Sequence, residues 1–251
     1  MLSHTGQKNR PPCLRGVFMY EEFNCDAGLV RIFDRSVGDE NIRIMAVGDG
    51  HQSAAFTAPE KHFEIIYPYM FGFDSVVQSL PECKNVLLMG GGGFSYPKYF
   101  LSRYPDKNMD AVELFEGIYQ LARKYFYLDE AVEKFDADNT RLGVVFGDAY
   151  KYLKTCGKKY DIILNDAYIG DKAPRKMYSP WALKDVTNCL NAGGVYAVNV
   201  FCTDGSLEKK CKALKKALDK FFSETEIIYD KTNEVSKVVR NCVVTARDPV
   251  K

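Results

Sequence analysis

The stretch VLLMGGGGFS, residues 86–95, decides the fold of this chain. Its first four residues form a continuous apolar run, which is typical of a strand buried on both faces of a parallel sheet. The run leads directly into four glycines at 90–93. Glycine tolerates positive φ and has no side chain, so the backbone can turn sharply there and approach a ligand closely. The stretch therefore predicts a strand that ends in a nucleotide-binding loop.

Further apolar runs follow this strand, and helical patterns separate them. The runs cover residues 142–146, 162–164 and 195–200, and the short segment 111–113 ends in Glu113. The helical patterns cover residues 96–104, 118–125, 150–153, 181–190 and 206–222. Strands that alternate with helices predict an α/β domain with a mainly parallel sheet, which we place at 60–251. The runs 226–229 and 242–246 predict a closing antiparallel hairpin with a long connection.

The first eighty residues follow a different pattern. Short apolar runs at 29–33 and 42–46 end in turn residues, which predicts antiparallel strands and a small β domain over residues 1–59. Residues 60–73 then carry aromatic and aliphatic side chains at steps of three and four, which predicts a helix. Pro68 must kink that helix or divide it in two.

The composition excludes several classes of protein. The chain has 251 residues, of which 46% are hydrophobic and 27% charged, so intrinsic disorder is excluded. Its 34 Lys and Arg residues balance 33 Asp and Glu residues, which argues against a nucleic-acid-binding protein because such proteins need a basic face. No apolar run approaches the roughly 20 residues of a membrane span, and residues 1–12 resemble no signal peptide. We expect a cytoplasmic protein without membrane contact.

The cysteines and histidines predict no metal site. The sequence contains no CxxC pair and only three histidines, too few to assemble a zinc site by spacing. Free cysteine is commonly buried, so we expect most of these residues to be reduced core thiols. The eight cysteines are Cys13, Cys25, Cys83, Cys156, Cys189, Cys202, Cys211 and Cys242.

Acidic residues stand at the ends of the predicted strands. Glu113 lies 21 residues beyond Gly92, where a carboxylate can accept hydrogen bonds from both ribose hydroxyls. Asp148 follows the run 142–146 and can accept from an adenine amino group, and Asp166 opens the next loop. Because ligands of parallel sheets bind outside the carboxyl ends of the strands, these residues predict a bound adenosine. The alternative is that each acid merely caps the following helix.

The glycine spacing separates two kinds of adenosine cofactor. The dinucleotide motif G-x-G-x-x-G requires glycine or alanine at Ser95 or at Tyr96, depending on its first glycine, and neither position complies. This spacing argues against a nicotinamide-dependent oxidoreductase and favours S-adenosylmethionine.

Residues 86–200 resemble the catalytic domain of the spermidine synthase family. The glycine motif resembles 89–93, the acidic segment after the second strand resembles 113–116, and the Gly-Asp-Ala motif resembles 147–149. The resemblance implies a Rossmann-like class I methyltransferase fold with a seven-stranded, mainly parallel sheet, helices on both faces and a small N-terminal β domain. It also implies a homodimer. The adenosyl cofactor is then held by Gln52, Gly90, Gly91, Gly92, Glu113, Asp148, Ala149 and Asp166.

Two departures from the family motifs bear on the reaction. Aminopropyltransferases of the family carry an aspartate at Gly93 and a second acid at Ile169. Those acids hold and deprotonate a diamine, and Asp171 is the nearest replacement. Gly93 also leaves backbone N–H groups free to receive the carboxylate of intact S-adenosylmethionine. The departures therefore favour S-adenosylmethionine over its decarboxylated form.

Transfer from a sulfonium requires alignment and, for a protonated nucleophile, one base. Asp166 is the candidate base or substrate anchor, and Tyr168 the candidate contact to the acceptor. His62 matches an amine-binding tyrosine of the family and is the third candidate catalytic residue. We predict an enzyme that transfers a methyl group to a small-molecule acceptor such as an amine. The alternatives are a polyamine aminopropyltransferase and a non-catalytic nucleoside-binding scaffold.

Overall fold

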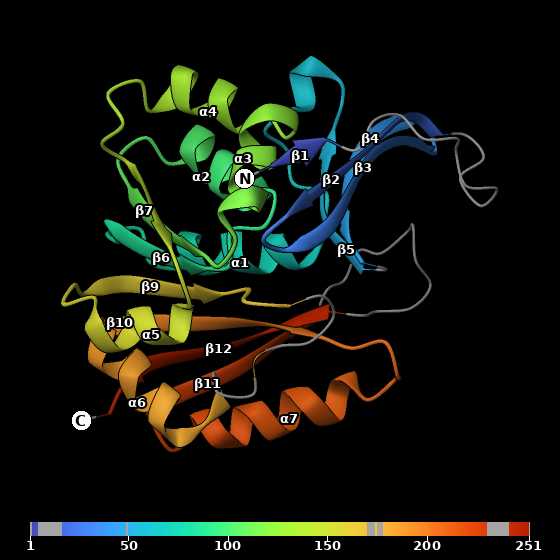
Figure 1. Cartoon of the computed structure of the whole chain (residues 1–251). Helices are drawn as coiled ribbons and strands as arrows, with labels where there is room; N and C mark the ends of the chain where they lie inside the picture. Colours follow the sequence, from blue (N-terminus) through green and yellow to red (C-terminus); the bar gives the residue numbers. More distant parts are fainter. Residues whose placement is uncertain are drawn as a thin grey trace.

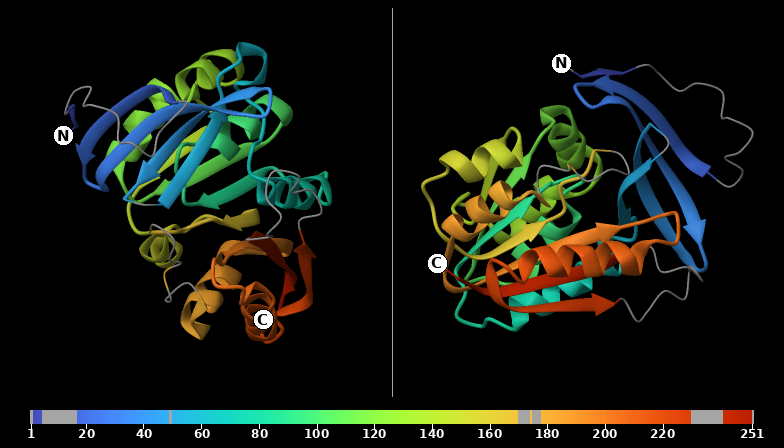
Figure 2. Two further views of the ribbon diagram at one scale, coloured as in Figure 1. Left: turned by 90° about the vertical axis from the view of Figure 1, so that its right-hand side faces the viewer. Right: turned by 90° about the horizontal axis from the view of Figure 1, so that it is seen from below.

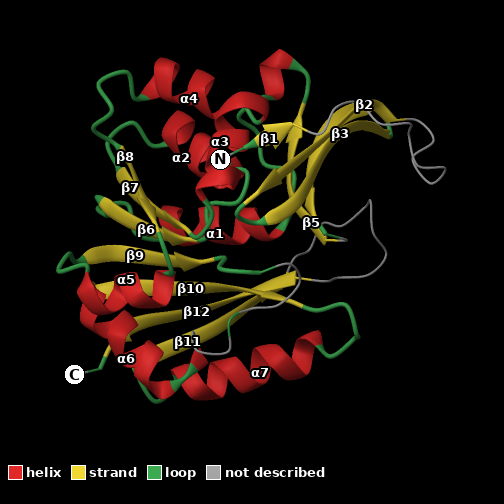
Figure 3. Cartoon of the chain, viewed as in Figure 1, coloured by secondary structure: helices red, strands yellow, loops and turns green. Residues whose placement is uncertain are grey.

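The computed structural model describes residues 2–4, 17–48, 50–169, 174, 178–229 and 241–250. Two sheets organise this part of the chain (Figure 1). The first has five strands in the order β1-β2-β3-β4-β5, and the second has seven in the order β11-β12-β10-β9-β6-β7-β8. Figure 3 shows that the helices gather around the second sheet.

The five-stranded sheet is antiparallel throughout. Its strands are β1 Ser3–His4, β2 Val17–Cys25, β3 Gly28–Val37, β4 Glu40–Val47 and β5 Gly50–Phe56. The two strands predicted from 29–33 and 42–46 lie within β3 and β4. Buried side chains of this sheet, including Val30 and Ile32, share a core with Ile118 of helix α3 (Glu116–Tyr125), and Ala122 of the same helix belongs to a core of the second sheet.

The helix predicted over residues 60–73 is confirmed only from Tyr69 onward. The chain forms only the 3-10 turn η1 (Pro59–Lys61) and then begins helix α1 (Tyr69–Gln78) after Pro68. Proline disfavours the helical conformation in the residue before it and lacks the N–H that a helix interior requires. Pro68 is thus the N-cap of α1 rather than a kink within a longer helix. The domain boundary at residue 59 stays a prediction.

The seven-stranded sheet confirms the α/β fold class. Its strands are β6 Asn85–Met89, β7 Asn108–Glu113, β8 Leu142–Phe146, β9 Tyr160–Asn165, β10 Leu190–Phe201, β11 Phe222–Tyr229 and β12 Asn241–Pro249. Neighbouring strands are parallel except at β12, which runs antiparallel to both β10 and β11. The predicted closing hairpin is confirmed, and its connection lies outside the described residues.

Helices cover both faces of this sheet (Figures 1 and 2). Helices α1, α2 and α3 lie on one face and α5, α6 and α7 on the other, while α4 packs over α2 and α3. The bounds not yet given are α2 Ser95–Arg103, α4 Leu128–Phe135, α5 Ala149–Thr155, α6 Pro180–Cys189 and α7 Leu207–Leu218. Successive residues of β6 serve both layers, because Leu87 belongs to the core under α5–α7 and Leu88 to the core under α1 and α2.

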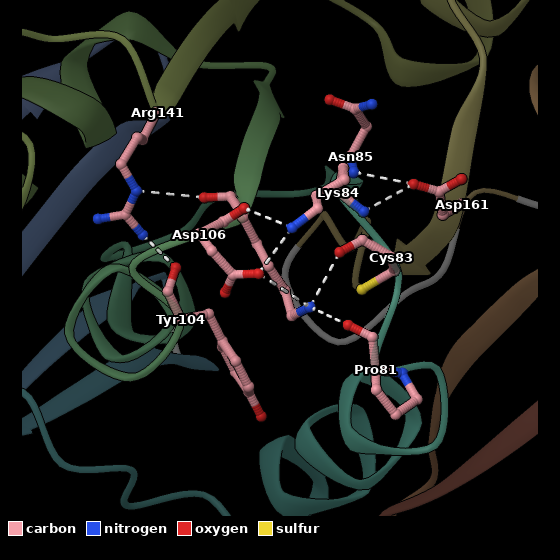
Figure 4. Close-up of polar contacts among 9 residues, drawn as sticks. Pro81, Cys83, Lys84, Asn85, Tyr104, Asp106, Arg141 and Asp161 are labelled. Atoms are coloured by element: carbon pink, nitrogen blue, oxygen red, sulfur yellow. Dashed lines mark hydrogen bonds and ion pairs between the residues drawn. The ribbon is translucent and has the colours of Figure 1, made fainter.

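Polar contacts secure the amino ends of the strands (Figure 4). Asp161 accepts hydrogen bonds from the backbone N–H groups of Lys84 and Asn85 at 2.8 and 3.0 Å, which joins the starts of β9 and β6. The buried Lys107 ammonium donates to the carbonyl oxygen of Cys83 at 2.9 Å. These contacts hold the strands in register at the edge opposite their carboxyl ends.

One cysteine pair differs from the expectation of reduced thiols. A disulfide joins Cys211 of α7 to Cys242 of β12, a pairing between a helix and a strand that spacing alone does not reveal. Cys13 lies outside the described residues. The free cysteines among the described residues are Cys25, Cys83, Cys156, Cys189 and Cys202. In the same part of the chain, no helix combines the length and apolar character that a membrane crossing requires.

Candidate active site

A cavity of about 930 Å³ lies at the carboxyl ends of β6–β10, beside the five-stranded sheet. This is the position expected for a ligand site in a parallel sheet. The cavity has two ends of different construction. We call residues Gly90, Gly91, Gly92, Glu113 and Asp148 its glycine end. We call residues Asp166, Tyr69 and Asn199 its aspartate end.

Gly90 is required at the glycine end because two loops meet there. Its φ is +94°, and a Cβ atom at this position would collide with the backbone carbonyl oxygen of Asp166. The amide N–H of Asp166 donates in turn to the carbonyl oxygen of Met89 at 2.8 Å. The ends of β6 and β9 thus touch through backbone atoms, and only a residue without a side chain fits between them.

Glu113 holds the glycine loop in place. Its Oε2 accepts hydrogen bonds from the N–H groups of Gly91 and Gly92, both at 2.9 Å, and its Oε1 accepts from the N–H of Phe115 at 3.0 Å. Burial raises the pKa of Glu113, and these N–H donors act in the opposite direction. Each carboxylate oxygen can accept more than one hydrogen bond, so Glu113 can also receive ligand hydroxyls.

The other predicted cofactor residues also line the cavity. Asp148 is the N-cap of α5, where its Oδ1 accepts from the N–H groups of Tyr150 at 2.8 Å and Lys151 at 3.2 Å. The capping alternative is therefore realised, and the same side chain still faces the cavity together with Ala149. Gln52 reaches the cavity from β5.

Gly93 is not available to a ligand, which corrects one expectation. It is buried, and its N–H donates to Ser53 Oγ of β5 at 2.6 Å. A Cβ atom at position 93 would lie 2.6 Å from Ser53 Cβ. Since the N–H groups of Gly91 and Gly92 bind Glu113, none of these three donors is free for the carboxylate of S-adenosylmethionine.

Asp166 is the centre of the aspartate end. Its Oδ2 accepts a hydrogen bond from the Tyr69 hydroxyl at 2.6 Å, and its Oδ1 accepts from Asn199 Nδ2 at 2.8 Å. The three side chains come from the loop after β9, from α1 and from β10. They meet inside the cavity although Tyr69 stands 97 positions before Asp166.

The surroundings of Asp166 raise its pKa from 3.8 to about 6. Burial is the largest cause, and the hydrogen bonds from Asn199 and Tyr69 act against it. Burial and the negative charge of Asp166 likewise raise the pKa of Tyr69, which stays a neutral donor. A carboxyl group that titrates near neutral pH can exchange a proton with a ligand.

Tyr168 lines the cavity, but its hydroxyl is engaged with β10. It donates to the carbonyl oxygen of Asn199 and accepts from the N–H of Phe201, both at 2.9 Å. These contacts of Tyr168 favour a structural role at the rim of the cavity.

The positions of the second family acid and of its nearest replacement are less informative. Ile169 is 54% exposed and also lines the cavity. Asp171 lies outside the described residues.

His62 is not brought to the cavity, which corrects its assignment as a candidate catalytic residue. It is 8% exposed, its ring stacks on Tyr127 with centroids 3.4 Å apart, and its Nδ1 lies 2.7 Å from Glu130 Oε2. It therefore packs η1 against α4. The match of His62 to an amine-binding tyrosine of the family therefore does not bring its side chain to the cavity.

Two residues of the aspartate end were absent from the sequence prediction. Tyr69 was missed because the pattern of residues 60–73 was interpreted as helix packing and the start of α1 at Tyr69 was not placed. Asn199 carried a readable signal, since it is a polar residue within the apolar run 195–200, and it is only 3% exposed. A buried amide near a strand's carboxyl end requires a partner, and that partner is Asp166.

Comparison with known proteins agrees with this geometry. Residues 70–249 match the spermine/spermidine synthase domain. The chain belongs to the spermine/spermidine synthase family. The resemblance seen in the glycine and acidic motifs is thereby confirmed, and the family uses S-adenosylmethionine or its decarboxylated form as the group donor.

Similar members of the family and related proteins differ in activity. The polyamine aminopropyltransferase of Vibrio vulnificus is 28% identical over 179 residues, which cover 70% of this chain and 57% of that protein. The eEF1A lysine and N-terminal methyltransferase of Xenopus laevis is 26% identical over 142 residues, covering 52% of this chain and 19% of that protein. The chain spans less than two thirds of the length of the first of these relatives.

Solved structures confirm the fold that the family implies. Spermidine synthase from Thermotoga maritima superposes with a TM-score of 0.66 at 16% identity, covering 92% of this chain and 72% of that one. The small antiparallel sheet and the mainly parallel sheet with helices on both faces are both shared features of this fold. The homodimer implied by the resemblance stays a prediction.

Proposed function

We propose that this transferase moves the aminopropyl group of decarboxylated S-adenosylmethionine to an amine, with Asp166 as the base. The supporting observation is a cavity carboxylate with a pKa of about 6, held between Tyr69 and Asn199. An ammonium group must lose a proton before its nitrogen can attack, and a base that titrates near neutral pH is suited to accept it. The names of the relatives support aminopropyl over methyl transfer.

The charge of the cavity fits this pair of substrates. Among the described residues that line it, Glu113, Asp148 and Asp166 carry carboxylates, and none is lysine or arginine. His51 also lines the cavity, and its pKa is lowered by burial and by the nearby arginines, so its ring is neutral at pH 7. Such a lining attracts a positively charged sulfonium and an ammonium ion.

Each end of the cavity then has a distinct task. At the glycine end, Glu113 receives the ribose hydroxyls while Asp148 and Ala149 lie beside the adenine. At the aspartate end, Asp166 removes one proton from the acceptor ammonium and later releases it to water. The donor supplies a carbon bound to positively charged sulfur; the nitrogen lone pair forms the new C–N bond as the C–S electron pair returns to sulfur. Alignment of nitrogen, carbon and sulfur is the main contribution of the fold.

Calorimetry and product mass test the proposal together. We expect decarboxylated S-adenosylmethionine to bind at least about tenfold more tightly than the intact form, a difference of about 1.4 kcal/mol. Incubation with putrescine should yield a product one aminopropyl group heavier, and Asp166→Asn should remove it. Donor binding without any amine product would instead support the non-catalytic scaffold.

Methyl transfer is the second candidate because of Gly93. The buried position 93 has no room for the aspartate that aminopropyltransferases of the family carry, which removes one acid from the set that holds an amine. Tighter binding of intact S-adenosylmethionine, together with a methylated product, would select this candidate over aminopropyl transfer.

A further inference from the structure

A chain of two side-chain amides connects Asp166 to the first residue of β12. Asn199 Nδ2 donates to Asp166 Oδ1 at 2.8 Å, and Asn241 Nδ2 donates to Asn199 Oδ1 at 2.9 Å. In the antiparallel pair β10–β12, Asn241 lies opposite Phe201, two positions beyond Asn199. Residues two apart on a strand share one face, so Asn199 and Asn241 are diagonal neighbours on the cavity side of the sheet.

The orientation of the Asn199 amide follows from this chain. The Asp166 carboxylate only accepts hydrogen bonds, so the NH₂ group of Asn199 must face it. The oxygen of Asn199 then points toward Asn241, whose NH₂ group satisfies it. An amide that turned by half a rotation would place its oxygen against the carboxylate. Because Asn199 is 3% exposed, water does not readily replace a lost partner.

We propose that Asn241 is a positioning residue, which acts through Asn199 to keep a hydrogen-bond donor on the proposed base Asp166. Neither the motifs of the sequence nor the family match points to this residue. Its effect on the reaction rests on the proposed function, whereas its effect on Asp166 does not.

The consequence concerns the protonation of Asp166. The Asn199 hydrogen bond favours the ionised carboxylate and opposes the effect of burial on its pKa. The titratable groups that face Asp166 are Glu113 of β7 and the tyrosines at 67, 69, 168 and 178. None of these is altered by a change at Asn241. Loss of the Asn241 donor should therefore raise the pKa of Asp166. The acidic limb of the profile of kcat/KM against pH should then move to higher pH.

Two variants of Asn241 separate positioning from charge. Asn241→Ala removes the donor without adding a charge. Asn241→Asp keeps the shape of the side chain but converts the donor to an acceptor, which forces the Asn199 amide to turn. We expect both to move the acidic limb upward, by about one pH unit, so that kcat/KM falls about tenfold near pH 5.5 and changes less than about twofold near pH 8.5. A shift in Asn241→Asp alone would be a charge effect and would overturn the proposal.

The double variant provides the sharper test. If Asn241 acts through Asn199, then Asn199→Ala combined with Asn241→Ala should shift the limb no further than Asn199→Ala alone. Additive shifts would contradict the proposal that Asn241 acts on Asp166 through Asn199. Asn191→Ala is the matched control, because Asn191 Nδ2 donates to Asp161 Oδ1 at 2.6 Å at the opposite edge of the sheet, and it should leave the limb unchanged.

A measurement without substrate keeps this inference separate from the proposed reaction. The carboxyl carbon of Asp166 can be titrated by NMR in protein labelled with ¹³C-aspartate and assigned through Asp166→Asn. We expect its midpoint to rise in Asn241→Ala and to stay constant in Asn191→Ala. If no amine is alkylated but the midpoint moves, then the proposed function fails and the positioning role holds. An unchanged midpoint in a folded Asn241→Ala protein refutes the positioning role.

Discussion

The two ends of the cavity are built in different ways. At the glycine end, backbone N–H groups of Gly91 and Gly92 meet one carboxylate that stands 21 or 22 positions away. At the aspartate end, side chains from α1, β10 and the loop after β9 converge, and the Tyr69 to Asp166 contact spans 97 positions. The first arrangement depends on short motifs that follow strands, and the second depends on how distant elements pack.

This difference separates donor binding from chemistry. The glycine end holds groups that every adenosyl donor shares, whereas the aspartate end decides which nitrogen is deprotonated. A substitution at one end should therefore leave the task of the other end largely intact. The following variants test that separation, beginning with the largest expected effect.

Asp166→Asn should reduce turnover about 10²–10⁴-fold, because the amide cannot accept a proton from the acceptor ammonium. Donor affinity should change by less than about threefold, since the glycine end is untouched. Steady-state rates with an amine acceptor measure the loss of turnover, and calorimetric titration with the donor measures its affinity. Asp129→Asn, which alters an exposed carboxylate paired with Arg123 of α3, is the control. Equal losses of turnover and of donor affinity would show that the two ends are not separable.

The same residue should impose a pH-dependent cost on stability. The pKa of Asp166 rises from 3.8 to about 6 on folding, so the folded protein retains a proton that the unfolded chain has lost. The cost is absent below pH 3.8, grows as the pH rises from 3.8 to about 6 and is complete above that range, where it corresponds to at most about 3 kcal/mol of unfolding free energy. Asp166→Asn should consequently raise Tm above pH 7, by about 2–4 °C for each kcal/mol, and the gain should vanish near pH 4. A Tm difference that is independent of pH would contradict the raised pKa.

The sequence predicted which strand ends line the cavity, and the reason is physical. A parallel strand that ends in glycine, or in an acid followed by a helix, brings its last residue to a common edge whatever the rest of the chain does. Gly90, Glu113, Asp148 and Asp166 could therefore be placed together from the order of strands and helices alone. The same reasoning yielded most strands of the seven-stranded sheet.

The partners of Asp166 could not be placed in that way. Tyr69 reaches the cavity because α1 begins after Pro68, and the periodic aromatic pattern of residues 60–73 concealed this start. Asn199 and Asn241 meet through the register of the antiparallel pair β10–β12, whose strands are separated along the chain by α7 and β11. Local propensity does not encode such register, because it depends on long-range packing.

Glu113→Gln should affect the opposite end. The substitution removes the charge and replaces one carboxylate oxygen, so the side chain no longer offers acceptors both to the glycine loop through Oε2 and to Phe115 through Oε1. We expect the donor Kd to rise about tenfold, in line with the loss of one hydrogen bond to a charged group. Turnover at saturating donor should fall less than about threefold. The control Glu116→Gln changes an exposed carboxylate in the first turn of α3 and should leave Kd unchanged.

His62→Gln should have the smallest effect on the reaction, because His62 belongs to neither end. Its ring stacks on Tyr127 and binds Glu130, so its loss should lower the unfolding free energy by about 1 kcal/mol. Turnover and donor affinity should both stay within about twofold of the unchanged protein. Denaturant unfolding and steady-state kinetics on the same preparation provide the comparison. A large loss of turnover with little loss of stability would restore His62 as a candidate catalytic residue. It would also show that residues outside the two ends of the cavity take part in the reaction.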